Sequence, residues 1–310
     1  MRVVVNLNIA ILGGTSHIAR AITPCLLDAG AKVSLFARNP EKLAGSPCRV
    51  IRGFGALMEE KFDLLINCIG AGTPKELAND FNRWFSVLEK FDNLALDYLK
   101  QVNPEALYVM FSSGAVYGRQ NGSPAVETSS WEFFPNHITV PDYYAIAKIY
   151  SEAKHRSLEK LRIVDLRIFS FFSRYIDLES GYFMTDLVKS LVNGSVMETS
   201  TGDMIRDYPH PEDLAELILK CAGVPQINTA IDVASSNPVS KTEILKIFAE
   251  KFALQYHFSA VGGNSPNGNV NVYIPTGDMA RQTVAWQARK SSIETLVSET
   301  EAILKHYGKA

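Results

Sequence analysis

Tyr144 and Lys148 stand four residues apart in the segment PDYYAIAK. On a helix this spacing puts both side chains on one face, one turn apart. A phenol has a pKa near ~10 in water, and a lysine ammonium held close to it favours the phenolate and lowers that pKa. The pair would therefore make an acid/base of the tyrosine. A serine hydroxyl brought in from elsewhere could hold the oxygen that gains or loses the proton, which completes the groups needed to interconvert an alcohol and a carbonyl.

A glycine-rich turn near the start of the chain could bind a nucleotide. The apolar run at 8–12 is followed by GGTSHIA from Gly13 and by a helical pattern that continues toward Gly30. Glycines would let the backbone approach a pyrophosphate, whose charge is met by amide groups at the helix N-terminus. Ser16 and Ala19 stand where the three-glycine form has its second and third glycines. A plain strand-to-helix turn is the alternative interpretation.

The first half of the chain alternates in the way that a doubly wound parallel sheet does. Such strands are largely apolar runs because helices cover both faces of the sheet. After the strand at 8–12, we expect strands at 32–37, 49–51, 63–69, 107–111 and 162–168, and helices at 81–100 and 143–160. Ligands of such folds bind at the carboxyl ends of the strands. Gly13, Arg38, Gly70 and Ser113 follow these ends, so we expect them near cofactor and substrate.

Six segments in this order resemble the extended short-chain dehydrogenase/reductases, specifically the NAD-dependent epimerase/dehydratase branch that acts on nucleotide-linked sugars. They are the turn at 13–19, NCIGA at 67–71, SSGAVYG at 112–118, Tyr144 with Lys148, LRIFS at 166–170, and TGDMIRDYPHPED at 201–213. The resemblance covers nearly the whole chain. It implies a Rossmann-type sheet with a smaller C-terminal α/β lobe that binds the substrate.

The resemblance also implies roles for individual residues. Tyr144 would be the general acid/base, Lys148 would hold the nicotinamide ribose and lower the pKa of the tyrosine, and Ser113 would supply the hydroxyl beside the reacting carbon. The implied cofactor-binding residues are Gly13, Gly14, Thr15, Ser16, His17, Ile18, Arg38, Gly70, Ala71, Tyr144, Lys148 and Phe169. The implied substrate-binding residues are Ser113, Ser170 and Arg206, although the family usually has asparagine where Ser170 stands. Arg206 would reach the diphosphate, which suits its planar guanidinium.

Arg38 bears on the choice of cofactor. Enzymes that use NAD usually place an acidic residue at the end of the second strand, whereas a basic residue there accommodates the extra phosphate of NADP. The segment FARNPEK carries no acid before the helix. NADP is therefore the predicted cofactor, with NAD as the alternative.

The predicted reaction is NADPH-dependent reduction of a ketosugar nucleotide. The segment at 201–207 is similar to that of ketoreductases which make dideoxy-sugar nucleotides. Dehydratases of the family carry an Asp-Glu pair after the catalytic hydroxyl, but Gly114 and Ala115 follow Ser113. An NAD-dependent C4-epimerase remains open. A non-catalytic nucleotide sensor also remains open, although such proteins normally lose the tyrosine or the lysine.

The second half of the chain is predicted to be divided between two domains. Residues 1–170 with 202–234 would form the NAD(P)-binding domain, and 171–201 with 235–310 the substrate-binding domain. A returning strand is expected at 231–234 and helices at 241–252 and 292–307. The segment 262–271 is rich in Gly, Asn, Ser and Pro and is predicted to be a loop, either a connector or a lid.

Composition excludes several other classes of protein. A chain of 310 residues with 46% apolar residues can bury a substantial core. The formal net charge of −2 gives no reason to expect nucleic acid or an anionic membrane as a partner. The four cysteines and six histidines are dispersed and suggest neither a metal site nor a disulfide framework. The apolar start lacks a cleavage site for a secretory signal, so a cytoplasmic enzyme is expected.

The helical segment 81–100 carries an apolar band that is wider than one sheet-facing stripe requires. In the resembled enzymes this helix and the one bearing Tyr144 often pair with their symmetry mates. We therefore expect a homodimer with a two-fold interface there. Packing of the extra aromatic residues under a loop of the same chain is the alternative.

Overall fold

The structure is a computed structural model. It describes residues 6–72, 77, 80–118, 123–126, 129, 131–259, 271–276 and 278–309. Within this part of the chain no helix is both long enough and apolar enough to cross a membrane.

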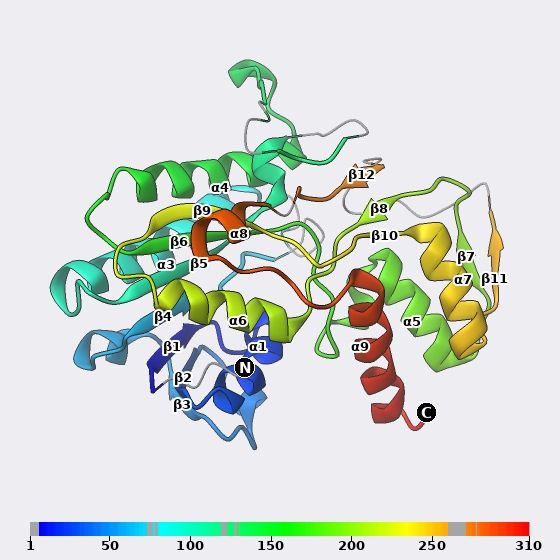
Figure 1. Ribbon diagram of the computed structural model, residues 1–310, viewed down its shortest axis with the longest axis horizontal. Coiled ribbons are helices and arrows are strands. Elements are labelled where there is room, and N and C mark those ends of the chain that lie inside the picture. The colour runs from blue at the N-terminus through cyan, green and yellow to red at the C-terminus, as the bar shows by residue number, and fades with distance from the viewer. Residues whose placement is uncertain are drawn as a thin grey trace.

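A seven-stranded parallel sheet forms the centre of the larger domain (Figure 1). Its strand order is β3-β2-β1-β4-β5-β6-β9, which confirms the predicted doubly wound fold. The strands are β1 Asn8–Leu12, β2 Lys32–Ala37, β3 Arg49–Arg52, β4 Leu64–Asn67, β5 Leu107–Ser113, β6 Ile163–Ile168 and β9 Asn228–Val233. All of them run parallel, so their carboxyl ends share one edge. β5 is longer than predicted and ends at Ser113, which is thus its last residue rather than the residue after it.

Helices cover both faces of this sheet, as its apolar strands require. Those that flank it are α1 His17–Asp28, α3 Asn82–Gln101, α4 Val140–Arg156 and α6 Pro211–Ala222. One hydrophobic cluster joins alternate strand residues to α1 and α6, and another joins the opposite strand faces to α3. Figure 1 shows α3 and α4 on one side and α1 and α6 on the other.

The start of α4 lies three residues before its predicted start. Thr139 and Asp142 form a capping box, in which the backbone N–H of Thr139 donates to Asp142 Oδ2 at 2.8 Å. The helix therefore begins at Val140 and not at Tyr143, and it ends at Arg156 and not at residue 160. Tyr144 and Lys148 remain within it, as predicted.

A smaller lobe has its own hydrophobic cluster. Its helices are α5 Phe183–Asn193, α7 Lys241–Phe252 and α9 Ser292–His306, which lie side by side in Figure 1. Its short strands are β7 Met197–Thr199, paired with β11 Tyr256–Phe258, and β8 Ile205–Arg206, paired with β10 Val239–Ser240 and β12 Val272–Tyr273. Short 3₁₀ turns lie at Pro40–Leu43, Gly55–Glu59, Gly114–Tyr117, Pro135–His137 and Leu178–Ser180.

One part of the predicted lobe packs elsewhere. Helix α8, Asp278–Val284, places Ala280 in the sheet's hydrophobic cluster, and Trp286 and Ala288 join it. These residues were predicted to belong to the substrate-binding domain. Of the predicted loop 262–271, only Asn271 is among the described residues, so the question of connector or lid lies outside them.

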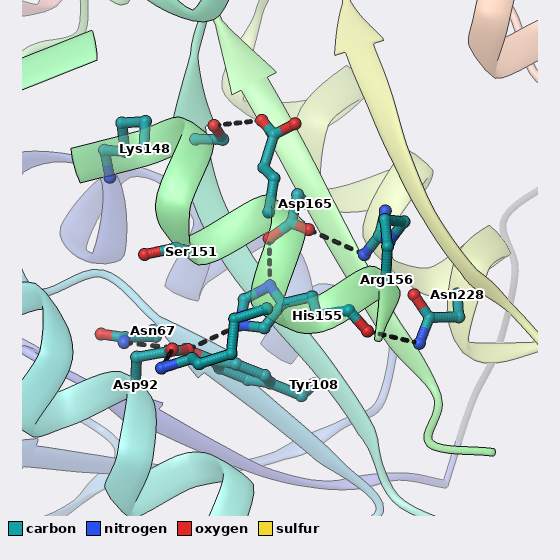
Figure 2. A network of polar contacts seen from close by, with 12 residues as sticks. Asn67, Asp92, Tyr108, Lys148, Ser151, His155, Arg156, Asp165 and Asn228 are labelled. Atoms are coloured by element: carbon teal, nitrogen blue, oxygen red, sulfur yellow. Dashed lines mark hydrogen bonds and ion pairs between the residues drawn. The ribbon is translucent and has the colours of Figure 1, made fainter. Parts of the chain in front are cut away.

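A buried network of polar side chains fixes α4 against α3 and β6. Figure 2 shows His155 between the carboxylates of Asp92 and Asp165. The His155 Nε2–Asp92 Oδ1 distance is 2.7 Å, the Nδ1–Asp165 Oδ1 distance is 2.8 Å, and all three residues are fully buried. Arg156 pairs with Asp165, and the Tyr108 hydroxyl donates to Asp92 Oδ1 at 3.0 Å. Each buried charge therefore has an opposite partner, as buried ions require.

The network changes the titration of His155. Burial opposes the charged imidazolium, but the hydrogen bonds to Asp165 and Asp92 outweigh burial and raise the pKa of His155 to about 9. Because this is above the unfolded value of ~6.5, the stabilisation is complete below pH ~6.5 and is lost as the pH rises through about 9.

We therefore expect the free energy of unfolding to fall between pH 6.5 and 9, by on the order of 3 kcal/mol from this group. Urea unfolding across that range measures it. His155→Gln, which cannot titrate, should flatten the profile, and the exposed His257→Gln should not. Parallel profiles for His155→Gln and wild type would show that His155 carries no charge in the fold.

Candidate functional site

The glycine turn is pressed onto the neighbouring strand. The N–H groups of Gly13 and Gly14 both donate to the Phe36 carbonyl, at 2.9 and 3.0 Å. Gly13 has a φ of +80°, and a Cβ on Gly14 would lie 2.8 Å from the Cβ of Leu35. Neither position has room for a larger residue without a shift of the backbone. A strand-to-helix turn that binds no nucleotide would not require such close contact.

The N-terminus of α1 follows directly and suits an anion. The Ser16 side chain caps it by accepting from the Ala19 N–H at 3.2 Å. Thr15, His17 and Ile18 are half-buried beside this cap. The first amides of a helix have no partner within the helix and carry the positive end of its dipole. These residues fit the pyrophosphate of a dinucleotide.

The His17 side chain packs against the protein interior rather than toward a ligand. Its ring lies 5.0 Å from that of Phe171, and burial lowers the pKa of His17 to about 4. Within the described residues its Nε2 has no hydrogen-bond partner. The imidazole is therefore neutral at pH 7, and only the backbone of His17 is suited to a phosphate.

Two exposed positions continue the same edge of the sheet. Arg38 follows β2 and is exposed, and among the described residues it forms no ion pair. Its neighbour Arg52 is already paired with Glu41. Gly70 lies three residues beyond β4, and a Cβ there would meet nothing within 4 Å. Both positions are therefore accessible to a nucleotide lying across the strand ends.

Tyr144, Lys148 and Ser113 meet at the end of β5. The Ser113 side chain lies close enough to Tyr144 to affect the tyrosine pKa, and the Ser113 hydroxyl accepts from the Ala115 N–H at 3.2 Å. Lys148 Nζ donates to the Phe111 carbonyl at 2.6 Å and lies 5.7 Å from the centre of the Tyr144 ring. The structure thus brings together the three residues that the sequence predicts to be catalytic.

Burial dominates the electrostatics of this centre. It raises the pKa of Tyr144, and the hydrogen bond from Ser113 opposes the increase. This differs from the predicted lowering of the tyrosine pKa by lysine, because removal of the phenol from water dominates and the opposing contribution comes from Ser113 rather than from Lys148. Burial also lowers the pKa of Lys148 to about 8, against the opposing charges of Asp165, Glu152 and Asp92. Lys148 is therefore mostly protonated at pH 7 and loses its charge only slightly above it.

Tyr273 belongs to the site and was missed from the sequence. Its hydroxyl lies 3.4 Å from Ser113 Oγ, and its ring lies 5.0 Å from that of Phe169. It comes from β12, directly after the segment predicted to be a loop. The alternation of Val270, Val272 and Ile274 with polar or aromatic residues is a strand pattern that could have found it.

The remaining predicted residues surround this centre. Phe169 is buried against Gly114, where a Cβ would lie 2.5 Å from its ring. Ser170 Oγ is buried without a partner among the described residues, as expected of a group that a ligand satisfies. Arg206 is 3% exposed, donates to the carbonyls of Ile205 and Asn271, and lies 6.0 Å from the Tyr273 ring centre. Its guanidinium therefore points inward beside Tyr273.

These side chains can move a proton at a hydroxyl or carbonyl group held next to Ser113. The glycine turn and the exposed strand ends provide the surface on which a nicotinamide dinucleotide would lie. Within the described residues no group of three or more His, Cys, Asp or Glu side chains could hold a metal ion. The fold and the site together define an enzyme of the NAD-dependent short-chain dehydrogenase/reductase type.

Residues 9–231 match the NAD dependent epimerase/dehydratase family, and the chain belongs to it. The UDP-glucose 4-epimerase of Streptococcus mutans is 25% identical over 248 residues, which cover 72% of each chain. The UDP-glucose 4-epimerase of Thermotoga maritima, solved with UDP-glucose, has a TM-score of 0.79 at 16% identity over 97% of this chain and 99% of its own. The UDP-N-acetylglucosamine 4-epimerase of Methanobrevibacter ruminantium was solved with UDP-N-acetylmuramic acid. It has a TM-score of 0.77 at 18% identity, over 97% of this chain and 99% of its own.

Proposed function

We propose that this protein transfers a hydride between a nicotinamide dinucleotide and a sugar carbon of a nucleotide-linked sugar, with epimerisation at C4 as its reaction. The observation that carries the proposal is the meeting of Tyr144, Lys148 and Ser113 at the end of β5. Family membership and the 25% identical UDP-glucose 4-epimerase support the substrate class. A nucleotide sensor would not need all three side chains.

The proposed roles follow from the contacts. Ser113 would donate a hydrogen bond to the sugar oxygen, and Tyr144 would take up or return the proton of that oxygen. Lys148, held by the Phe111 carbonyl, would keep a positive charge near the phenol so that the phenolate is accessible. A bound nicotinamide supplies or accepts the hydride at the same carbon. The same side chains would serve both directions, and return of the hydride to the opposite face of the sugar would invert that carbon.

Arg38 favours a second candidate, NADPH-dependent reduction of a ketosugar nucleotide. An exposed arginine without an ion pair among the described residues, at the end of β2, suits the 2′-phosphate of NADP. A reductase consumes NADPH and releases the oxidised cofactor, whereas an epimerase retains its NAD. Nicotinamide fluorescence of the purified protein, before and after NADPH is added, separates the two.

We also propose that the chain forms a homodimer through α3 and α4. A hollow of about 230 Å³ on these helices is lined by Phe85, Leu88, Glu89, Ile146, Ala147 and Tyr150. Tyr150 is 48% exposed there. Two aromatic residues of the wide apolar band are instead covered within the chain, because Trp84 packs on Tyr144 and Phe91 packs on Phe54.

Tyr144→Phe removes only the hydroxyl that carries the proton. We expect the turnover of UDP-glucose or of the true substrate to fall by ~10²–10⁴, with cofactor affinity within a few-fold. Steady-state kinetics and fluorescence titration with cofactor measure the two quantities. If more than about a tenth of the activity remained, Tyr144 would not be the acid/base.

Arg38→Ala should weaken the binding of NADPH much more than that of NADH, since only NADPH carries the 2′-phosphate. Loss of a charge-assisted contact is worth roughly 1.5–3 kcal/mol, or about tenfold or more in Kd. Fluorescence titration measures both cofactors, and Arg52→Ala, which removes an arginine already paired with Glu41, is the matched control. Equal losses of affinity for NADPH and NADH would refute the preference for NADP. The NAD-dependent epimerase would then remain as the candidate function.

Tyr150→Glu should dissociate the dimer at micromolar concentration, because it places a charge in an apolar two-fold contact. Sedimentation velocity distinguishes the dimer from the 34.3 kDa chain. Phe134→Glu, at a residue 71% exposed outside this hollow, is the control. A monomeric wild type would refute the dimer, and a dimer that survives Tyr150→Glu would place the contact on another surface.

A further inference from the structure

A row of polar side chains crosses three strands directly beneath the catalytic edge. Ser112 of β5 is the register partner of Arg167 of β6, and Arg167 is the register partner of Asp232 of β9. The next row toward the edge holds Ser113 and Ile168. The polar row is therefore one residue away from Ser113, which lies beside Tyr144.

Glu152 of α4 contacts side chains of two strands in this row, β5 and β6. Its Oε1 accepts from the Ser112 hydroxyl at 2.5 Å, and its Oε2 accepts from Arg167 Nη2 at 2.6 Å. Arg167 Nε also donates to both carboxylate oxygens, at 3.0 and 3.2 Å. Glu152 is 8% exposed, so these contacts are made largely out of water.

The row continues on the far side of Arg167. Its Nη1 donates to the Tyr117 hydroxyl at 2.5 Å, and that hydroxyl donates to Asp232 at 2.9 Å. The Tyr117 ring stacks on Phe169, 6.2 Å between centres. The chain of contacts that begins at Glu152 therefore ends against the residue predicted to contact the nicotinamide.

Glu152 also lies on the catalytic face of α4. Tyr144, Lys148 and Glu152 follow one another at intervals of four residues, so they share one face of the helix. Lys148 donates to the Phe111 carbonyl and Glu152 accepts from the Ser112 hydroxyl, while Ser113 affects the pKa of Tyr144. Two consecutive residues of β5, Phe111 and Ser112, are thus held by two consecutive turns of α4, and Ser113 follows them beside Tyr144.

The carboxylates beneath Lys148 also act on its charge. Burial lowers the pKa of Lys148, and the charges that oppose this effect are Asp165 on β6, Glu152 on α4 and Asp92 on α3. Asp92 and Asp165 are shared with His155, Lys154 and Arg156, whereas Glu152 is paired with Arg167. Asp92 contacts β5 at Tyr108, far from the catalytic end of the strand, whereas Glu152 contacts Ser112, the neighbour of Ser113.

We propose that Glu152 is a positioning residue of the catalytic centre, which clamps Ser112 and Arg167 so that Ser113 faces Tyr144, and which places a carboxylate one helical turn from Lys148. The role in catalysis rests on the proposed function of Tyr144 and Lys148. The clamp and the effect on Lys148 do not require a substrate, so they can be measured separately.

The test uses full-length protein carrying Glu152→Gln, which keeps the shape of the side chain and removes its charge. Lysine labelled with carbon-13 at Cε reports the Lys148 titration by NMR, with the resonance assigned by its absence in Lys148→Arg. We expect a midpoint near pH 8 in wild type and one roughly one unit lower in Glu152→Gln. Glu299→Gln is the matched control, because Glu299 is a buried carboxylate paired with an arginine, Arg174, in the other lobe.

Kinetics with UDP-glucose and the retained or added cofactor provide the second readout. Glu152→Gln should lower kcat by ~10–100-fold through misplacement of Ser113 and Lys148, with KM within about threefold. Ser112→Ala keeps the Glu152–Arg167 ion pair and removes the contact with β5, so it should lower kcat without moving the Lys148 midpoint.

An unchanged Lys148 midpoint in Glu152→Gln, or one that moves equally in Glu299→Gln, overturns the inference. If Glu152→Gln does not fold, Ser112→Ala decides alone, and a kcat equal to that of wild type overturns the clamp. The proposed function fails on a different result, namely full activity of Tyr144→Phe. A shifted Lys148 midpoint together with an active Tyr144→Phe would retain the effect of Glu152 on Lys148 and refute the proposed chemistry.

Discussion

Lys148 donates from its ammonium to the Phe111 carbonyl at a depth where water is largely excluded. A buried cation is costly unless opposite charges and hydrogen bonds compensate for it. Three carboxylates, on α3, α4 and β6, supply that compensation. Elements from three parts of the fold are thus tied to one lysine beside Tyr144. Burial nevertheless lowers the pKa of Lys148 to about 8.

Those carboxylates require cations of their own, and the cations come from α4 and β6. His155 and Arg156 neutralise Asp92 and Asp165, and Arg167 neutralises Glu152. Because α4 contributes to both groups of contacts, it cannot rotate or slide without exposing a buried charge. The helix that carries the proposed acid/base is thus fixed along much of its length. Rigid support of this kind is what positioned proton transfer needs.

The opposite side of the site is built from short, separate pieces. Tyr273 and Arg206 come from two-residue strands that pair with each other in register. Arg38 and the glycine turn lie along the ends of β1 and β2. The positions of these residues do not depend on contacts with Tyr273 or Arg206. These residues can therefore differ in sequence while the contacts between α4 and β5 are retained.

The sequence by itself determined the doubly wound fold, the nucleotide turn and the Tyr144–Lys148 pair, because periodicity, glycine spacing and helical spacing are local properties of the chain. Tertiary structure alone decided which buried partners surround that pair. Burial raised the pKa of Tyr144 where proximity to lysine predicted a decrease, and desolvation cannot be seen from spacing. The tertiary structure also placed Tyr273 beside Ser113, 160 residues away in the chain, and joined Glu152 to Ser112 and Arg167. Contacts between distant segments depend on how strands and helices align in space, which no single segment encodes.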